Sequence, residues 1–157
     1  MSEIRTPFET DFTLRYALAL NARHRHLYSK MRMIFTGLNL LAGMAAVVTL
    51  ITLWPWMAGF IGLLVCFVSV LDLLIAPGDK VYTFSDMQRR WSELQSNLHA
   101  LDAAERERQI NQLLNEPHPI IDGLRAVAYN DACQQTGVAA EHHSTTNRWA
   151  RMLATIS

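Results

Sequence analysis

Histidine and cysteine are the residues of this chain whose types best suit chemistry, and their spacing argues against a metal centre. His24 and His26 are two positions apart, which places their side chains roughly 200° apart around a helix, so they cannot bind one metal ion together. His142 and His143 are adjacent in an expected loop, where a histidine pair without a third ligand is usually solvated. We therefore expect no bound metal.

Nucleophilic and cofactor-binding patterns are weak as well. Cys133 with a distant histidine is a possible nucleophile pair, but a single thiol gives almost no specificity. The sequence contains no glycine-rich phosphate loop, no serine nucleophile motif and no paired-carboxylate pattern. We expect a protein that is not an enzyme and holds no cofactor. A membrane-bound enzyme stays open as a third class only because Cys133 and the two adjacent histidines exist.

Charge is distributed unevenly along the chain. Its 157 residues include 14 Lys and Arg and 14 Asp and Glu, so there is no net basic charge for binding nucleic acid. All of these charges lie in residues 1–32 and 72–157, and the 39 residues from Met33 to Leu71 carry none. A soluble protein of this length could hardly cover such a stretch. It is about twice the length that one membrane-spanning helix needs.

Two membrane-spanning helices are expected in this block, at residues 33–53 and 57–76. Pro55 favours a turn between them, because proline removes a backbone donor and disfavours helix at the preceding residue. Trp54 and Trp56 flank the proline and suit a membrane–water interface. The expected fold is all-α, with a cytoplasmic amphipathic helix in residues 1–32, a two-span transmembrane hairpin in 33–76 and a cytoplasmic helical region in 77–157.

The positions of the cations predict the orientation. Lys and Arg precede the first span and follow the second, whereas the turn has none, so both termini are expected on the cytoplasmic side of a bacterial inner membrane. The cations before the first span are expected to form a cationic collar at the lipid headgroups together with His24 and His26. The collar cations are Arg23, Arg25, Lys30 and Arg32. The bilayer is thus an expected partner, and nucleic acid is not.

The N-terminal helix is expected to begin with a capping box of Thr6 and Glu9 around Pro7. No helix breaker occurs before Gly37, so this helix can run straight into the first span. Its apolar stripe is expected to consist of Phe8, Phe12, Tyr16 and Ala19.

The cytoplasmic helices are bounded by capping and stop signals. Pro77-Gly78-Asp79 ends the second span, Ser85 with Gln88 and Asp102 with Glu105 form further capping boxes, and Glu116-Pro117 is a stop. Two later helices are expected at 120–136, followed by Gly137, and at 146–156.

One of these helices carries apolar residues at heptad spacing, as in a short coiled coil. The members of this seam are Met87, Trp91, Leu94, Leu98 and Leu101. The seam either packs against the N-terminal helix or forms a self-association interface, and both hold in an oligomer.

Polar and small residues stand out within the spans. Asn39, Gly43 and Ala46 lie on nearly one side of the first span, where they either pack helices together or line a narrow oligomeric pore. Asp72 lies near the cytoplasmic boundary of the second span. It either pairs with Lys30 or Arg32 or forms an acidic ring at a pore mouth, which would favour cations.

This layout resembles a known family. A helix with a His- and Tyr-containing end (His24, His26, Tyr28) leads into two spans, and a helical region with Glu116-Pro117 and Leu124-x4-Tyr129-Asn130 follows. The arrangement over residues 8–136 is similar to the SLATT-type two-transmembrane proteins of bacteria and their mobile elements. That resemblance implies a pore-forming effector of anti-phage defence that responds to a nucleotide signal.

The sequence therefore leaves two alternative hypotheses for the function. The first is a small homo-oligomeric inner-membrane protein that permeabilises or depolarises the membrane when a cytoplasmic protein or nucleotide signal acts on it. The alternative is a membrane anchor or adaptor that recruits a cytoplasmic partner through its C-terminal helices. Both need the same hairpin.

Overall fold

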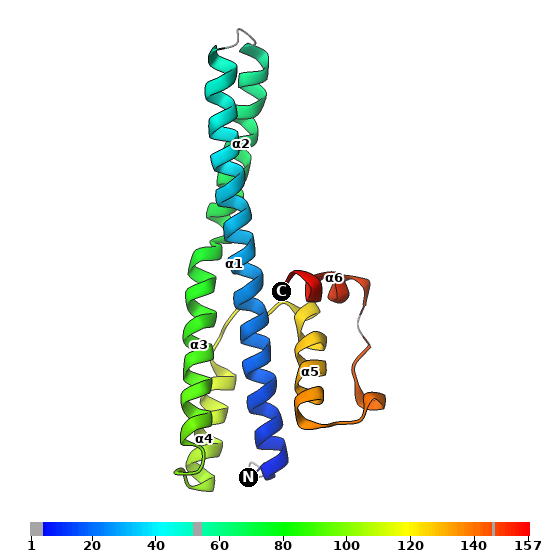
Figure 1. Ribbon diagram of the computed structural model, residues 1–157. Coiled ribbons are helices and arrows are strands. Elements are labelled where there is room, and N and C mark those ends of the chain that lie inside the picture. Colours follow the sequence, from blue (N-terminus) through cyan, green and yellow to red (C-terminus); the bar gives the residue numbers. More distant parts are fainter. Residues whose placement is uncertain (1–4, 52–54, 146) are drawn as a thin grey trace. The chain divides into compact units, whose positions relative to one another are not determined.

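The computed structural model describes residues 5–51, 55–145 and 147–157, which form helices and the segments between them. No strand occurs in this part of the chain, so the expected all-α class is confirmed. The helices are α1 (Pro7–Ile51), α2 (Pro55–Ile75), α3 (Pro77–Asn97), α4 (Ala103–Asn115), α5 (Asp122–Thr136) and α6 (Arg148–Ile156), with a 3-10 turn at Ala140–His142 (Figure 1).

The chain divides into two compact units. The first combines Met1–Leu27 with Val81–Ser157, and the second is Tyr28–Lys80. The long helix α1 contributes residues to both. We call them the C-terminal-rich unit and the hairpin unit.

Helix α1 begins at the expected capping box. The Thr6 N–H donates to Glu9 Oε2 at 2.7 Å, and the Glu9 N–H donates to Thr6 Oγ1 at 3.2 Å. Two backbone donors at the helix start are thereby satisfied, which is the physical basis of the motif. From this point α1 continues without a break to Ile51, as expected.

The core of the C-terminal-rich unit is formed where α1, α3 and α4 meet. Its buried members are Leu14, Ala17, Trp91, Leu94 and Ile110. Trp91 is only 2% exposed and is the largest fully buried side chain of the unit. The heptad seam thus packs within the chain.

The apolar stripe expected on α1 is not the main buried face of this helix. Phe8 is exposed, and Phe12 instead contacts the ring of Tyr129 on α5, with centroids 5.4 Å apart. The buried face of α1 runs through Leu14 and continues into polar side chains. These buried polar residues are Thr10, Asn21 and His24.

Helix α3 starts earlier and ends earlier than expected. It begins at Pro77, so Ser85 lies inside the helix rather than at a start, and it ends at Asn97. Leu98 and Leu101 of the seam therefore follow the helix, where they stay half-buried. The guanidinium of Arg106 donates to both of their carbonyl oxygens at 3.2 Å, which stabilises this turn.

Three further helix ends show where the expected caps form and where they do not. Asp102 precedes α4 in an extended conformation, but its side chain makes no capping hydrogen bond, so the expected box is wrong there. Gly137 ends α5 with φ of 72°, a left-handed conformation that favours glycine. Helix α6 begins after Asn147, whose Oδ1 accepts from the Arg148 N–H at 2.6 Å.

Candidate membrane-embedded hairpin

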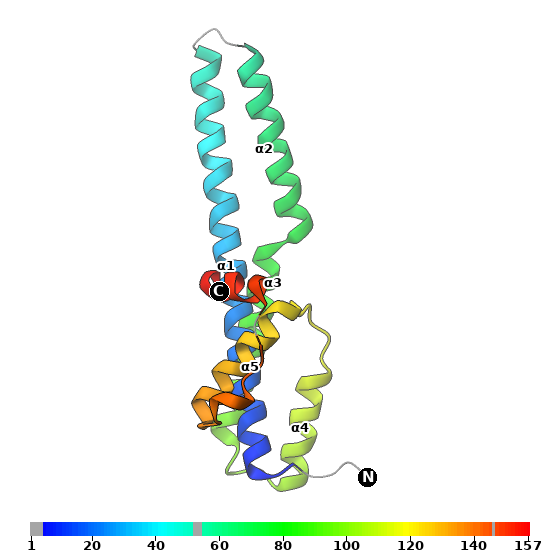
Figure 2. The ribbon, with the colours of Figure 1, turned by 90° about the vertical axis from the view of Figure 1, so that its right-hand side faces the viewer.

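The C-terminal half of α1 and the whole of α2 run antiparallel as a helical hairpin (Figure 2). A hydrogen bond between side chains links the two helices, because Ser69 Oγ donates to Asn39 Oδ1 at 3.3 Å. The turn between the helices, including Trp54, lies outside the described residues. Trp56, at the start of α2, has an exposed side chain.

The surface of the hairpin is apolar and exposed. Its large exposed side chains are Met33, Ile34, Leu38, Leu40, Leu41, Met44, Phe60, Leu63, Leu64, Phe67, Val70, Leu73 and Leu74. Among the described residues, one helical segment, Gly59–Asn97, contains a stretch long and apolar enough to cross a membrane, and none of that stretch is buried. The stretch belongs to α2, since α3 is rich in charge. Residues 46–51 of the first expected span have no described side chains.

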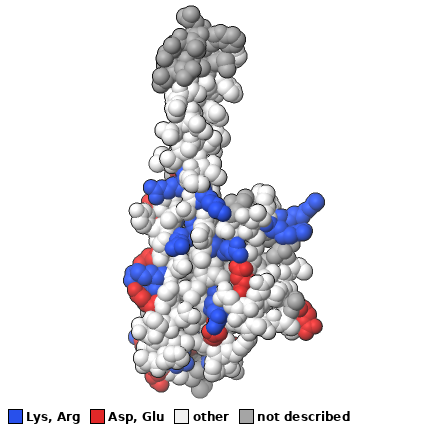
Figure 3. Space-filling view, viewed as in Figure 1, with Lys and Arg blue, Asp and Glu red and all other residues white. Residues whose placement is uncertain are grey.

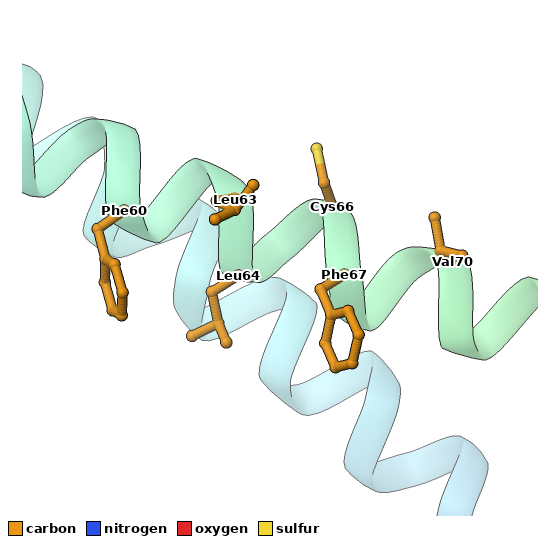
Figure 4. A pocket seen from close by; sticks show the side chains of 6 residues that line it. All are labelled: Phe60, Leu63, Leu64, Cys66, Phe67 and Val70. Carbon is orange, nitrogen blue, oxygen red and sulfur yellow. The ribbon is translucent and has the colours of Figure 1, made fainter.

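The outer face of α2 is hollowed into an apolar groove. Phe60, Leu64 and Phe67 point to one side of the helix, as their spacing of four and three residues requires (Figure 4). Together with Leu63, Cys66 and Val70 they line a cavity of about 440 Å³. Water would solvate such a surface poorly, whereas lipid chains or another apolar helix would fill it.

A second apolar groove lies between the two helices of the hairpin. It has a volume of about 320 Å³ and is lined from both sides, for example by Ala42 of α1 and Val65 of α2. The helices therefore do not fill the space between them completely. Gly43 of α1 has an exposed position, and a Cβ added there would meet no atom within 4 Å.

Polar groups in the hairpin form a short seam near its open end. Thr36 lies three residues before Asn39, and Asp72 lies three residues after Ser69. Because the two helices are antiparallel, Thr36 and Asp72 lie at a similar level along the hairpin. Asp72 is half-buried, and no ion pair joins it to Lys30 or Arg32 among the described residues. That expected pair is therefore not found. Ala46, on the expected polar side, lies outside the described side chains.

Cations gather at the open end of the hairpin. Lys30 and Arg32 of α1 are exposed, and Lys80 Nζ lies 5.1 Å from the centre of the Tyr28 ring, a cation–π contact. In Figure 3 the white part of the hairpin carries no blue Lys or Arg atoms. Lys30 and Arg32, two of the cations predicted to form the collar, are thus exposed at this end of the hairpin.

Two expected members of the collar have a different environment. Arg23 donates to both carboxylate oxygens of Asp131 on α5, at 2.9 and 3.2 Å. His24 is fully buried and its ring stacks on Phe84, with centroids 4.6 Å apart. His24 has no exposed surface to offer to lipid headgroups, so placing it in the collar is wrong. Arg23 is bound within the C-terminal-rich unit but is 28% exposed, and its place in the collar stays a prediction. Arg25 is half-buried and His26 is exposed.

The residues whose types suit chemistry differ in how deeply their side chains are buried. Cys133 is fully buried in α5, which is typical of a structural thiol. His142 is exposed and lies 3.8 Å from Glu141. No group of three His, Cys, Asp or Glu side chains in the described part of the chain is placed to hold a metal ion.

A comparison with protein-family models, with curated proteins and with solved structures finds no match to this chain.

Proposed function

We propose that this is an integral membrane protein in which both helices of the hairpin cross the bilayer and both termini face the cytoplasm. The exposed apolar surface of the hairpin supports this proposal, because such a surface is stable in lipid and not in water. The absence of charge between Met33 and Leu71 supports it for both helices. The cations at the open end support the orientation.

Its function, in this proposal, is to permeabilise the membrane as a homo-oligomer. The observation that carries this step is the hydrogen-bonded pair of Asn39 and Ser69, in which Ser69 is exposed on the hairpin. Asn39 lies six residues after Met33, and Ser69 lies six residues before the end of α2, so both are about 9 Å inside the hairpin. Polar groups at this depth favour a protein contact or water over lipid.

Association of several hairpins would satisfy that preference. Copies that turn the Asn39–Ser69 side toward a common centre would give it a polar lining, and the apolar groove of α2 would face lipid or a neighbour. Asp72, one turn closer to the cytoplasm, would add an acidic ring at the mouth. The resemblance to SLATT-type proteins supports the same function, with a cytoplasmic protein or nucleotide signal as the trigger.

Reconstitution into vesicles loaded with a self-quenching dye tests the proposal. We expect the full chain to release dye and to form a complex of four or more copies in detergent. The double variant Asn39→Leu with Ser69→Ala should reduce release at least tenfold while inserting normally. Cys66→Ala, on the outer groove, is the matched control and should leave release unchanged. A dimer that releases no dye under any added trigger would overturn the proposal.

One observation favours the alternative function of an anchor or adaptor. The C-terminal-rich unit has its own core and an exposed surface rich in ion pairs, such as Arg89 with Asp86 at 2.7 Å and with Glu93 at 2.6 Å. Such a surface suits a soluble partner. Recovery of a stoichiometric partner with the full chain, together with vesicles that stay sealed, would favour the adaptor over the pore.

A further inference from the structure

Helix α6 combines cations with large apolar side chains within nine residues. Its sequence is RWARMLATI, with two arginines, a tryptophan and a methionine and no acidic residue. Residues three or four apart share a side of a helix, so Arg148 and Arg151 lie on one side, and Trp149, Met152 and Leu153 lie on the adjacent one.

Only part of this apolar side is used to hold α6 in place. Leu153 reaches α5 so closely that a Cβ added at Gly123 would lie 2.8 Å from its Cδ1 atom. The C-terminal end of α6 is held by Arg23, which donates to the Ala154 carbonyl at 3.1 Å and to Ser157 Oγ at 3.2 Å. Leu153 and Ala154 are half-buried as a result. The helix is therefore anchored on one side.

The other side of α6 is exposed and mixed in character. Trp149 is 65% exposed and Met152 is 47% exposed, and Arg148 and Arg151 are exposed beside them. Figure 3 shows Lys and Arg atoms projecting at the position of α6, with no Asp or Glu beside them on this face. Asp122, the acid next to Gly123 at the start of α5, is paired with Arg125 at 3.2 Å. A tryptophan and a methionine flanked by exposed cations form a surface typical of a helix that lies in a membrane interface.

We propose that the exposed side of α6 binds the surface of an anionic phospholipid bilayer, with Trp149 and Met152 inserted among the headgroups and Arg148 and Arg151 on the lipid phosphates. The charge is complementary, because the cytoplasmic leaflet is negative. Tryptophan suits this depth, since its ring is apolar and its N–H can bond to polar groups.

The inference rests on the proposed insertion of the hairpin, which supplies a tether. Arg23, which holds the end of α6, lies ten positions before Met33 at the start of the first expected span. Even a fully extended chain of that length reaches only about 35 Å. The chain therefore keeps α6 within about that distance of the start of the first expected span, and a nine-residue helix that would bind lipid weakly alone gains from the resulting high effective concentration.

An environment-sensitive fluorophore on the full chain tests this inference. The label is placed on Met152→Cys in a Cys66→Ala background, with Gln135→Cys, an exposed position on α5, as the control site. The chain is reconstituted into phosphatidylcholine vesicles with or without phosphatidylglycerol. We expect the label at 152 to shift to the blue and to be quenched by lipid-attached spin labels, only in anionic vesicles. The label at 135 should remain aqueous in both.

Charge reversal checks the role of the arginines. Each cation near an anionic surface contributes about fivefold to binding, so Arg148→Glu with Arg151→Glu should lower the ratio of bound to free α6 about 25-fold or more. Arg108→Glu, an exposed cation on α4, is the matched control and should have no effect.

A parallel label on the native Cys66 separates this inference from the proposed function. Lipid quenching at Cys66 with an aqueous label at 152 would overturn the α6 inference and leave the inserted hairpin intact. Lipid quenching at 152 with an aqueous Cys66 would contradict the hairpin and support α6. A blue shift at 152 without lipid quenching would mean that protein, such as a second copy, covers α6, and would also overturn the inference.

Discussion

The Nε2 atom of His24 accepts a hydrogen bond from the backbone N–H of Ile121 at 2.9 Å, across 97 positions of sequence. The other ring nitrogen, Nδ1, donates to the Leu20 carbonyl at 2.8 Å. Both bonds together require the neutral imidazole, because a proton on Nε2 would leave the Ile121 N–H without its acceptor. His24 thus joins the middle of α1 to the residue that precedes α5.

This relationship predicts that the C-terminal-rich unit loses stability in acid. Burial lowers the pKa of His24 below its usual 6.5, the hydrogen bond to the Leu20 carbonyl opposes this shift, and the nearby His118 and Arg125 add to it. The unfolded chain therefore binds a proton at a higher pH than the folded chain does. The contribution of His24 to the free energy of unfolding is therefore complete above the pKa of the unfolded chain, and it declines as the pH falls below about 6.5. We expect the melting temperature in detergent to drop by several degrees between about pH 7.5 and pH 5.5.

Replacement of the histidine identifies its share of this dependence. His24→Gln keeps a donor and an acceptor but does not titrate, so its melting temperature should be lower at neutral pH and flatter against pH. His26→Gln, at an exposed position two residues away, should retain the full pH dependence. An unchanged pH dependence in His24→Gln would show that other groups cause it.

The bidentate pair of Arg23 and Asp131 predicts a measurable coupling in a double-mutant cycle. Their side chains are 28% and 26% exposed, and the two N–H donors point at two carboxylate oxygens. We expect Arg23→Ala, Asp131→Ala and the double variant to give a coupling of about 1–2 kcal/mol in the free energy of unfolding. Arg23→Ala should cost more than Asp131→Ala, because it also removes the bonds to α6.

An exposed ion pair on α3 supplies the control for this cycle. Arg89 and Glu93 are 2.6 Å apart but more than half exposed, so their coupling should be about 0.3–0.5 kcal/mol. Equal couplings in the two cycles would contradict a structural role for Arg23.

Local signals in the sequence predict the local features of this fold well. The capping box of Thr6 and Glu9 and the terminal glycine Gly137 depend only on residues within a few positions, and both occur as expected. The helix of α2 is visible in the same way, since charge is absent from it over most of its length.

Features that depend on distant partners could not be predicted. Arg23 and His24 lie close to the first span in sequence, which suggests a headgroup collar, but Asp131 and Ile121 are about 100 residues away. The same cause explains the buried face of α1. Because that face includes Asn21 and His24, its apolar periodicity is interrupted, and the more regular stripe through Phe8 was the stronger signal.

The close contact of Gly123 with Leu153 predicts that a larger side chain on α5 will displace α6. Gly123→Val places branched atoms where Leu153 lies, so we expect a loss of about 1–3 kcal/mol in stability and faster hydrogen exchange in α6. Leu153→Ala in the same chain removes the obstructing atoms and should restore part of the loss. Gly123→Ala should be nearly neutral, because the end of Leu153 can move. Losses that simply add in the double variant would contradict this contact.

Substitutions at two residues in the left-handed conformation should change the stability of the fold in opposite directions, because one residue is glycine and the other is not. Ala76 has φ of 45° and joins two helices: its N–H donates to Asp72 of α2 at 2.9 Å, and its carbonyl accepts from Lys80 of α3 at 3.3 Å. The apolar helix α2 thus ends just before Pro77-Gly78-Asp79, as expected, and those three residues begin α3. A Cβ in this conformation costs about 1–2 kcal/mol, so Ala76→Gly should stabilise the folded chain by up to about 1 kcal/mol after the added freedom of the unfolded chain is subtracted. Gly137→Ala, at φ of 72°, should destabilise it by about 1 kcal/mol.

Unfolding of both variants in mixed micelles, followed by circular dichroism, measures the two effects, and Gly78→Ala serves as a control that should be neutral or slightly stabilising. Destabilisation by Ala76→Gly would mean that the joint tolerates alanine without strain.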